Sequence, residues 1–229
     1  HDKYNQKLSQ FNRHCLHLCG RSIYKQTQKI VNKWRPEYLP LTVIYSPKDV
    51  KLKVKKQDNI TYISQKLSNQ QLEVMMNKHS IHLCCSETEG FGHYINEAKS
   101  CQVLVVSTDA PPMNELVDKK CGLSIKFRRE KTLYKTLGNK YEFDDNHFHE
   151  IISSLEKISE KDIREKGILA RKSYFENEKR FRNNFYGCFQ VIFNRMNKLS
   201  PLNLQIKIPI DKLPTVSIVT LVYNRRRFF

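Results

Sequence analysis

Long apolar runs, a leader sequence and metal-binding cysteine patterns are all missing from this sequence. No run approaches the roughly 20 apolar residues of a membrane-spanning helix. No secretory signal peptide is visible, and the first residue is His1 rather than methionine, so we expect a piece of a longer protein. Low-complexity tracts and internal repeats are also absent. What remains is a chain of 229 residues, long enough for one globular domain and a tail.

The seven cysteines do not have the spacing of a metal site. Six of them lie in or beside segments expected to be ordered, which predicts buried, reduced thiols: Cys15, Cys19, Cys84, Cys85, Cys101 and Cys121. Reduced thiols are typical of a reducing compartment. The sequence therefore favours a cytoplasmic location, with peripheral attachment to a membrane surface as a second option.

Positive charge is in excess, because 40 Lys and Arg face 23 Asp and Glu and the net charge is +17. Such a charge attracts nucleic acid, nucleotide sugars or an acidic membrane surface. The basic residues are spread along the chain without an arginine-rich arm, so nucleic acid is the least favoured partner. Lysines in the segment 51–56 interleave with Leu52 and Val54, which predicts an edge strand with a lysine face.

Strand-like and helix-like segments alternate over residues 1–196. This pattern predicts an α/β domain with a Rossmann-like parallel sheet and flanking helices. The expected strands are 14–19, 41–45, 60–63, 81–85, 103–106 and 122–125. The expected helices are 27–33, 69–78, 91–100, 112–117 and 146–158.

A long helical region is predicted at 160–196, where a stripe at helical spacing is interpreted as core: Phe181, Phe185, Phe189 and Ile192. Residues 197–214 contain three prolines and predict a linker. The run 215–225 then predicts the first strand of a further domain, and residues 215–229 would contain only the beginning of that domain. A strand within the linker is the alternative.

The segment from Ser86 to Ala98, Ser-Glu-Thr-Glu-Gly-Phe-Gly-His-Tyr-Ile-Asn-Glu-Ala, lies between an apolar strand and an apolar-periodic helix. A glycine turn that opens a helix presents free N–H groups to phosphate oxygens, and Gly90 and Gly92 allow close approach and a positive φ. Glu89 stands where a strand ends, and Glu97, about one turn into the helix, can point back at a ribose diol. The alternative is a capped surface helix with solvated glutamates.

This segment resembles the E-x7-E motif of retaining glycosyltransferases with the GT-B fold, specifically the family-four group. Residues 100–109 resemble that family's small-residue turn, buried strand and loop. Residues 110–117 resemble its loop ending in a glutamate, here Glu115. Because these blocks recur in the family's order, the resemblance extends over residues 14–195.

Upstream, residues 16–21 and Lys25 resemble the strand, glycine and basic pair that hold the donor diphosphate. The resemblance implies that Arg21 and Lys25 neutralise the diphosphate, that Glu97 binds the ribose and that Glu89 is the catalytic carboxylate beside the transferred sugar. The other donor contacts that it implies are Gln65, Lys66 and Leu67 beside the base, together with Gly90, Phe91, Gly92 and Glu115.

Three positions depart from the family's pattern. Gln26 stands where a glycine usually follows the lysine, Gln102 stands where a Gly-Val-Pro sequence usually begins, and Pro112 stands where a glycine is common. Farther on, the run 215–225 resembles the first strand and turn of a GT-A, family-two glycosyltransferase.

The resemblance therefore implies the carboxyl-terminal donor domain of a retaining glycosyltransferase. It implies no metal and no cofactor besides the substrate, a UDP- or GDP-linked sugar, since the protein supplies positive charge and this region holds no Asp-x-Asp motif. The acceptor, a glycan, protein or lipid, would need the missing amino-terminal domain, so residues 1–229 are expected to be inactive alone. A non-catalytic nucleotide-sugar-binding or scaffolding domain and a sugar-nucleotide epimerase are the alternatives.

Overall fold

The computed structural model describes residues 2–133 and 138–199. The chain divides into two units, residues 1–175 and 176–229. The first unit holds the sheet and most of the helices, and the described part of the second is the continuation of one long helix. The predicted linker beyond residue 199 and the predicted strand at 215–225 lie outside the described residues.

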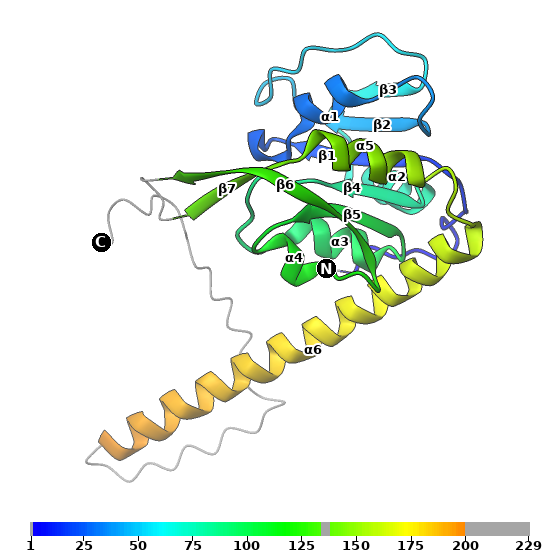
Figure 1. Cartoon of the computed structure of the whole chain (residues 1–229). Coiled ribbons are helices and arrows are strands. Elements are labelled where there is room, and N and C mark those ends of the chain that lie inside the picture. The colour runs from blue at the N-terminus through cyan, green and yellow to red at the C-terminus, as the bar shows by residue number, and fades with distance from the viewer. Residues whose placement is uncertain (1, 134–137, 200–229) are drawn as a thin grey trace. The chain divides into compact units, whose positions relative to one another are not determined.

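A seven-stranded sheet forms the centre of the first unit, in the order β3-β2-β1-β4-β5-β6-β7 (Figure 1). The strands are β1 (Cys15–Gly20), β2 (Leu41–Tyr45), β3 (Ile60–Ile63), β4 (Ile81–Cys84), β5 (Leu104–Asp109), β6 (Gly122–Leu133) and β7 (Gly138–Phe143). Neighbouring strands are parallel except for β6 and β7, which are antiparallel. This is the Rossmann-like α/β sheet that the alternation of strands and helices predicts.

Helices cover both faces of the sheet. The helical elements are η1 (Ile23–Lys25), α1 (Thr27–Lys33), α2 (Asn69–Lys78), α3 (His93–Ser100), α4 (Met113–Leu116), α5 (Asp145–Ser154) and α6 (Glu160–Leu199). Because strand side chains alternate between faces, two cores form. Leu104 and Val106 of β5 belong to the core under α1 and α5, whereas Val105 belongs to the core under α2 and α3.

Local sequence explains where several helices begin. Ser68 and Gln71 form a capping box at the start of α2, with hydrogen bonds of 3.2 and 2.8 Å. Asp144 caps α5 by accepting a hydrogen bond from the His147 backbone N–H at 2.8 Å. The expected bounds hold for α1, α2, β2 and β3, and the other predicted elements are present with shifted ends, except the edge strand.

One predicted strand is absent, and another is longer than predicted. Residues 51–56 form no strand; they pass beside α1, where Gln28 exchanges two hydrogen bonds with the backbone of Lys53. The strand expected at 122–125 is in fact the first part of β6, which continues past the sheet and pairs with β7 as a two-stranded ribbon. The helix α6 also runs to Leu199, three residues into the segment predicted as linker.

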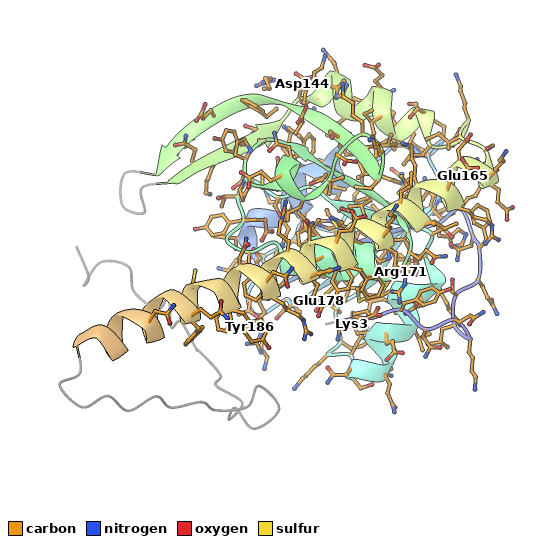
Figure 2. All side chains as sticks on the ribbon, turned by 90° about the horizontal axis from the view of Figure 1, so that it is seen from below. Lys3, Asp144, Glu165, Arg171, Glu178 and Tyr186 are labelled. Carbon is orange, nitrogen blue, oxygen red and sulfur yellow. The ribbon has the colours of Figure 1, made fainter. Side chains whose placement is uncertain are left out.

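The first part of α6 is attached to the domain by buried and paired polar groups. The ammonium of Lys99, which is fully buried, donates to the Leu116 carbonyl at 2.6 Å and to Ser173 of α6 at 3.0 Å. Arg171 makes two contacts of 2.7 and 2.8 Å with Asp2, and Figure 2 labels Arg171 together with Lys3 of the same amino-terminal segment. These contacts fix the start of α6 against α3 and α4.

The second part of α6 does not bear out the prediction of a buried aromatic stripe. Phe181 is 55% exposed, although the rings of Phe181 and Phe185 stack with centroids 5.9 Å apart and Phe189 lies 4.8 Å from Phe185. The side chain of Ile192 lies outside the described residues. Although α6 has 40 residues, neither it nor any other helix in the described ranges has a stretch apolar enough to cross a membrane.

Six cysteines are buried and all seven are free thiols, as the prediction of buried, reduced cysteines requires. Burial raises the pKa of Cys85 to about 12, so this thiol stays protonated. The seventh, Cys188, is exposed.

Gln26 and Gln102, two of the positions that depart from the family's pattern, both have a positive φ, of 53° and 61°. This backbone region is unfavourable for residues with a Cβ, so replacing Gln102 by glycine should stabilise the fold by about 0.5–1 kcal/mol in urea unfolding. The matched control is Gln26→Gly, which relieves the same conformation but also removes the side chain's three hydrogen bonds described below. It should destabilise the protein, and stabilisation by both changes would contradict this account.

Candidate functional site

The candidate site lies where β1 and β4 separate. These neighbouring strands pair only at Cys15 with Ile81 and at Leu16 with His82. The chain leaves β1 through α1 on one face and leaves β4 through α3 on the other. In open α/β sheets such a reversal opens a crevice at the carboxyl ends of the strands, and ligands bind there.

His17 joins β1 and β4 next to the point where the two strands separate. It is fully buried on β1, its Nδ1 donates to the Leu83 carbonyl of β4 at 2.8 Å, and its Nε2 lies 2.9 Å from the hydroxyl of Thr27. Because a carbonyl can only accept, Nε2 is the unprotonated nitrogen and accepts from Thr27. Burial lowers the pKa of His17 to about 4, so the ring is neutral and acts as a fixed structural link.

Across the crevice, Lys25 from the β1 side forms an ion pair with Glu89 from the β4 side. The two side chains are only 12% and 13% exposed. Burial lowers the pKa of Lys25, and the hydrogen bond and charge of Glu89 act in the opposite direction. The ion pair therefore connects Lys25, which is predicted to bind the diphosphate, with Glu89, which is predicted to be the catalytic carboxylate.

Two further side chains hold this pair. Ser86 donates to the Glu89 carboxylate at 2.6 Å and lies 2.9 Å from the Tyr94 hydroxyl. The ammonium of Lys25 lies over the Tyr94 ring, 3.1 Å from its centroid. Burial raises the pKa of the Tyr94 phenol well above its ordinary value, so the hydroxyl keeps its proton. Lys25, Glu89, Ser86 and Tyr94 thus form one connected group, which we call the crevice cluster.

Gln26 ties this site to β7. Its buried amide nitrogen donates to the carbonyls of Cys85 and Tyr141, both at 3.3 Å, and its carbonyl oxygen accepts from the Phe143 N–H at 3.2 Å. A glycine at position 26 could make none of these bonds. The three side-chain hydrogen bonds therefore compensate for the unfavourable left-handed backbone at Gln26, and they connect the end of β4 to β7.

Glu87 connects the same region to the ribbon. Its N–H donates to the Tyr24 carbonyl at 2.8 Å, and its own carbonyl accepts from the Tyr141 N–H at 2.7 Å. Its carboxylate pairs with Lys140 at 2.9 Å, and that ammonium lies 4.2 Å from the centroid of the Tyr24 ring. Lys140 and Tyr141 of β7 therefore lie against both loops of the crevice.

The amino-terminal end of α3 faces the site, as the motif predicts, but the helix begins at His93 rather than at residue 91. Gly92 has φ 69° and provides no side-chain cap, so the first N–H groups of α3 receive no bond from it. Gly90, by contrast, does not have a positive φ, which corrects the prediction for that residue. Phe91 is 57% exposed.

The predicted site residues are not all brought together. Glu97 is partly buried on the second turn of α3, and its carboxylate forms no hydrogen bond or ion pair with another described residue. Arg21 is 83% exposed and lies 3.6 Å from Asp49, whereas Lys25 is in the crevice cluster. The remaining candidates are residues 65–67, which follow β3, and Glu115, which lies in α4. The side chains of Gln65, Lys66 and Glu115 are exposed, and that of Leu67 is partly buried.

A groove of about 870 Å³ adjoins the crevice on the α1 side. It shares Ser22, Gln26 and Glu87 with the surroundings of the crevice. None of the predicted site residues lines it, so it is a neighbouring hollow rather than the predicted donor site. Its walls carry lysines that are already paired with acids, such as Lys29 with Glu142 and Asp145, both at 2.9 Å.

Sequence reasoning did not identify Ser86, Tyr94, Gln26 or Glu87 as part of the site. Ser86 and Tyr94 stand inside the motif that was recognised, but neither has a charge that would single it out. For Gln26 the only signal was its departure from the expected glycine. The bonds made by Glu87 to Lys140 and Tyr141 join segments more than 50 residues apart, and no local pattern reports them.

Comparison with known proteins agrees with this architecture. Residues 45–155, which include β3 to β7 and α3, match the model of the family described as "Glycosyl transferases group 1". None of the curated protein sequences matches the chain.

Solved glycosyltransferase structures share the fold. A glycosyltransferase from Rickettsia africae ESF-5 has a TM-score of 0.58 at 13% identity, over 78% of this chain and 48% of its own. The carboxyl-terminal domain of LpcC, a group 1 family protein from Francisella tularensis, has a TM-score of 0.52 at 18% identity, over 71% and 85%. HepE from Anabaena, solved with UDP, has a TM-score of 0.54 at 14% identity, over 72% and 44%.

These likenesses show that the sheet and its helices have the Rossmann-like fold found in GT-B glycosyltransferases. The chain spans about half the length of the Rickettsia protein and most of the Francisella domain.

Proposed function

We propose that this chain is the donor-binding domain of a retaining, metal-independent glycosyltransferase and that it binds a UDP- or GDP-linked sugar. The observation that carries the proposal is the crevice cluster, in which Lys25 and Glu89 reach one point from opposite sides of the switch between β1 and β4. A buried cation beside the amino-terminal end of α3 suits a diphosphate. A carboxylate at the same point suits the hydroxyl groups or the developing positive charge of the transferred sugar.

The other candidates take roles that follow from their positions. The Glu97 carboxylate, which has no hydrogen-bond or ion-pair partner among the described residues, is available to a ribose diol. Residues 65–67, after β3, would lie beside the base. Arg21 would contribute long-range attraction rather than a buried contact, because it is largely exposed and has Asp49 as a neighbour. The match of residues 45–155 to a glycosyltransferase family and the UDP bound to HepE support this proposal.

A thermal-shift screen with UDP, GDP and ADP sugars tests the donor class. A ligand at 100 times its dissociation constant adds roughly 2.7 kcal/mol to the free energy of unfolding. For a chain of this size that should raise the melting temperature by roughly 5–11 °C. Stabilisation by UDP or GDP sugars supports the proposal, and no shift with any nucleotide sugar would refute it.

Removing the Glu97 carboxylate should weaken nucleotide binding without unfolding the domain. Loss of a charge-assisted hydrogen bond costs about 1.5–3 kcal/mol, so Glu97→Ala should raise the dissociation constant of UDP about 10- to 150-fold. Calorimetry checks the affinity and circular dichroism checks the fold. Glu150→Ala, which removes an exposed carboxylate on α5, is the comparison for a general loss of negative charge. Equal UDP affinity in parent and Glu97→Ala would remove Glu97 from the site.

The isolated chain should bind donor but transfer no sugar. Holding donor and acceptor in reactive geometry contributes roughly 7–11 kcal/mol to catalysis, and in GT-B enzymes the acceptor is held mainly by the other Rossmann-like domain. We therefore expect saturable UDP-sugar or GDP-sugar binding with, at most, slow hydrolysis, measured by release of the nucleoside diphosphate. Rapid glycosyl transfer to a simple acceptor by residues 1–229 would contradict this.

A further inference from the structure

Tyr94 contacts both charged members of the crevice cluster. Its ring lies beneath the Lys25 ammonium, 3.1 Å from centroid to Nζ, and its hydroxyl lies 2.9 Å from the Ser86 oxygen that donates to Glu89. The ring itself packs with the core of α2 and α3. One aromatic side chain, fixed by the hydrophobic core, therefore supports the cation directly and the carboxylate through one hydroxyl group.

The same geometry shows that the two charges satisfy each other in this structure. Lys25 and Glu89 are each about one-eighth exposed and are paired. A diphosphate can use the Lys25 ammonium only if Glu89 gives up that contact, since a carboxylate and a phosphate would otherwise share one buried cation at close range. Ser86 donates to the same carboxylate oxygen, Oε1, that Lys25 contacts, so Ser86 keeps its bond only if the Glu89 carboxylate turns about that oxygen.

We propose that Tyr94 is a positioning residue that keeps the Lys25 ammonium in the crevice, and that a diphosphate binds by displacing Glu89 from Lys25. This inference rests on the proposed donor-binding function. Cation–π contact is what makes Tyr94 suitable, because the ring attracts the ammonium without a charge of its own and does not compete with phosphate. Displacement then releases the Glu89 carboxylate toward the sugar only when donor is present.

Labelling of lysines tests the positioning role without any nucleotide. The chain is treated briefly with an amine-reactive ester, and mass spectrometry measures the labelling rate at each lysine. Lys25 should react slowly in the parent and several-fold faster in Tyr94→Leu, whereas Tyr94→Phe, which keeps the ring, should resemble the parent. Fully buried Lys99 reports unfolding and exposed Lys51 reports reagent activity. Unchanged Lys25 labelling in Tyr94→Leu, with Lys99 still protected, would overturn the positioning role.

Calorimetry with UDP and with inorganic pyrophosphate tests the exchange. Loss of the cation–π contact in Tyr94→Leu should weaken both ligands about 2- to 30-fold, with little change in Tyr94→Phe. Tyr174→Leu removes another mostly buried tyrosine, on α6, and should leave both affinities unchanged. Glu89→Gln should bind pyrophosphate more tightly than the parent, because the competing carboxylate has been neutralised.

The outcomes separate the two proposals. If the parent binds neither UDP nor GDP, the proposed function fails, while the labelling result still decides the role of Tyr94. If the parent binds UDP but Tyr94→Leu binds it equally well, the positioning role fails and the proposed function stands. Weaker pyrophosphate binding by Glu89→Gln would show that Glu89 assists the anion rather than competing with it, and would overturn the exchange.

Discussion

Replacing Lys25 by methionine should weaken UDP binding about 10- to 150-fold, the effect of losing a charge-assisted hydrogen bond worth about 1.5–3 kcal/mol. Replacing Arg21 in the same way should change the affinity less than about 5-fold, since exposed ion pairs contribute about 0–1 kcal/mol. The difference follows from position: Arg21 is 83% exposed beside Asp49, and Lys25 is 12% exposed beside Glu89.

The Lys25 substitution needs a control because it leaves the Glu89 carboxylate without its cation. Breaking one side of a buried pair destabilises a fold more than removing both charges. The double variant Lys25→Met with Glu89→Gln should therefore recover stability in urea unfolding while still binding UDP weakly. Equal losses of UDP affinity in Arg21→Met and Lys25→Met would show that both residues form a general basic surface and that the crevice holds no diphosphate.

Hydrophobic periodicity was sufficient to predict the parallel sheet. The bounds of β2 and β3 were as expected because apolar and β-branched residues fill these strands between polar loops. The helices α1 and α2 were also predicted correctly, and Ser68 with Gln71 marks the start of α2 in sequence as well as in structure. In these elements, local preference and tertiary packing favour the same conformation.

The ribbon shows where periodicity fails. The sequence from Lys126 to Lys140 is rich in charged residues and has no clear alternation of apolar and polar positions. The part of the ribbon next to the sheet is instead fixed by contacts between residues distant in sequence. The Tyr141 N–H donates to the Glu87 carbonyl, and the rings of Phe127 and Tyr141 form a T-shaped contact with centroids 5.0 Å apart. The opposite error occurred at 51–56, where the alternation of lysines resembled a strand. The backbone of Lys53 instead bonds to the Gln28 side chain of α1.

The candidate site was predictable to a similar extent. The motif pointed to the segment between β4 and α3. In the structure Glu89 lies in the loop after β4, Gly92 caps α3 and Glu97 lies on the second turn of that helix. It could not show that Lys25 pairs with Glu89 while Arg21 turns toward Asp49, because those partners are 64 and 28 residues away. The charges were identified from sequence, but their pairing depends on the tertiary fold.

Acid should destabilise this domain well before its carboxylates are protonated. His17 and His82 are fully buried, and burial lowers their pKa values to about 4 and about 3 from the ordinary 6.5. The unfolded chain therefore takes up protons below pH 6.5 that the folded chain cannot accept. The stability from the neutral rings is complete above pH 6.5 and is lost as the pH falls toward 4 for His17 and toward 3 for His82.

Each of these two histidines should cost up to about 1.4 kcal/mol per pH unit in this window, so the two together should remove up to roughly 2.7 kcal/mol per unit. His79 and His149, whose pKa values burial also lowers, add to the slope. Asp2, Asp118 and Asp145 also have lowered pKa values, but their ordinary value is 3.8, so their contribution disappears only in stronger acid. Urea unfolding between pH 6.5 and 5 therefore isolates the histidines. A free energy of unfolding that stays constant over this range would contradict the burial of both rings.

Substitution assigns the slope to individual rings. His17→Gln keeps a donor for the Leu83 carbonyl and an acceptor for Thr27 but cannot titrate, so it should reduce the slope by up to about 1.4 kcal/mol per pH unit. In the parent, Nε2 of His82 lies 2.9 Å from the Met76 carbonyl oxygen. His82→Gln should reduce the slope by a similar amount.

His17 differs from His82 in one respect that links stability to the candidate site. Only His17 spans β1 and β4 beneath the crevice cluster, and a protonated ring could no longer accept from Thr27. Because the folded His17 ring takes up a proton only near pH 4, UDP affinity should stay constant between pH 6.5 and 5. It should fall as the pH approaches 4 in the parent and in His82→Gln, and should fall less in His17→Gln.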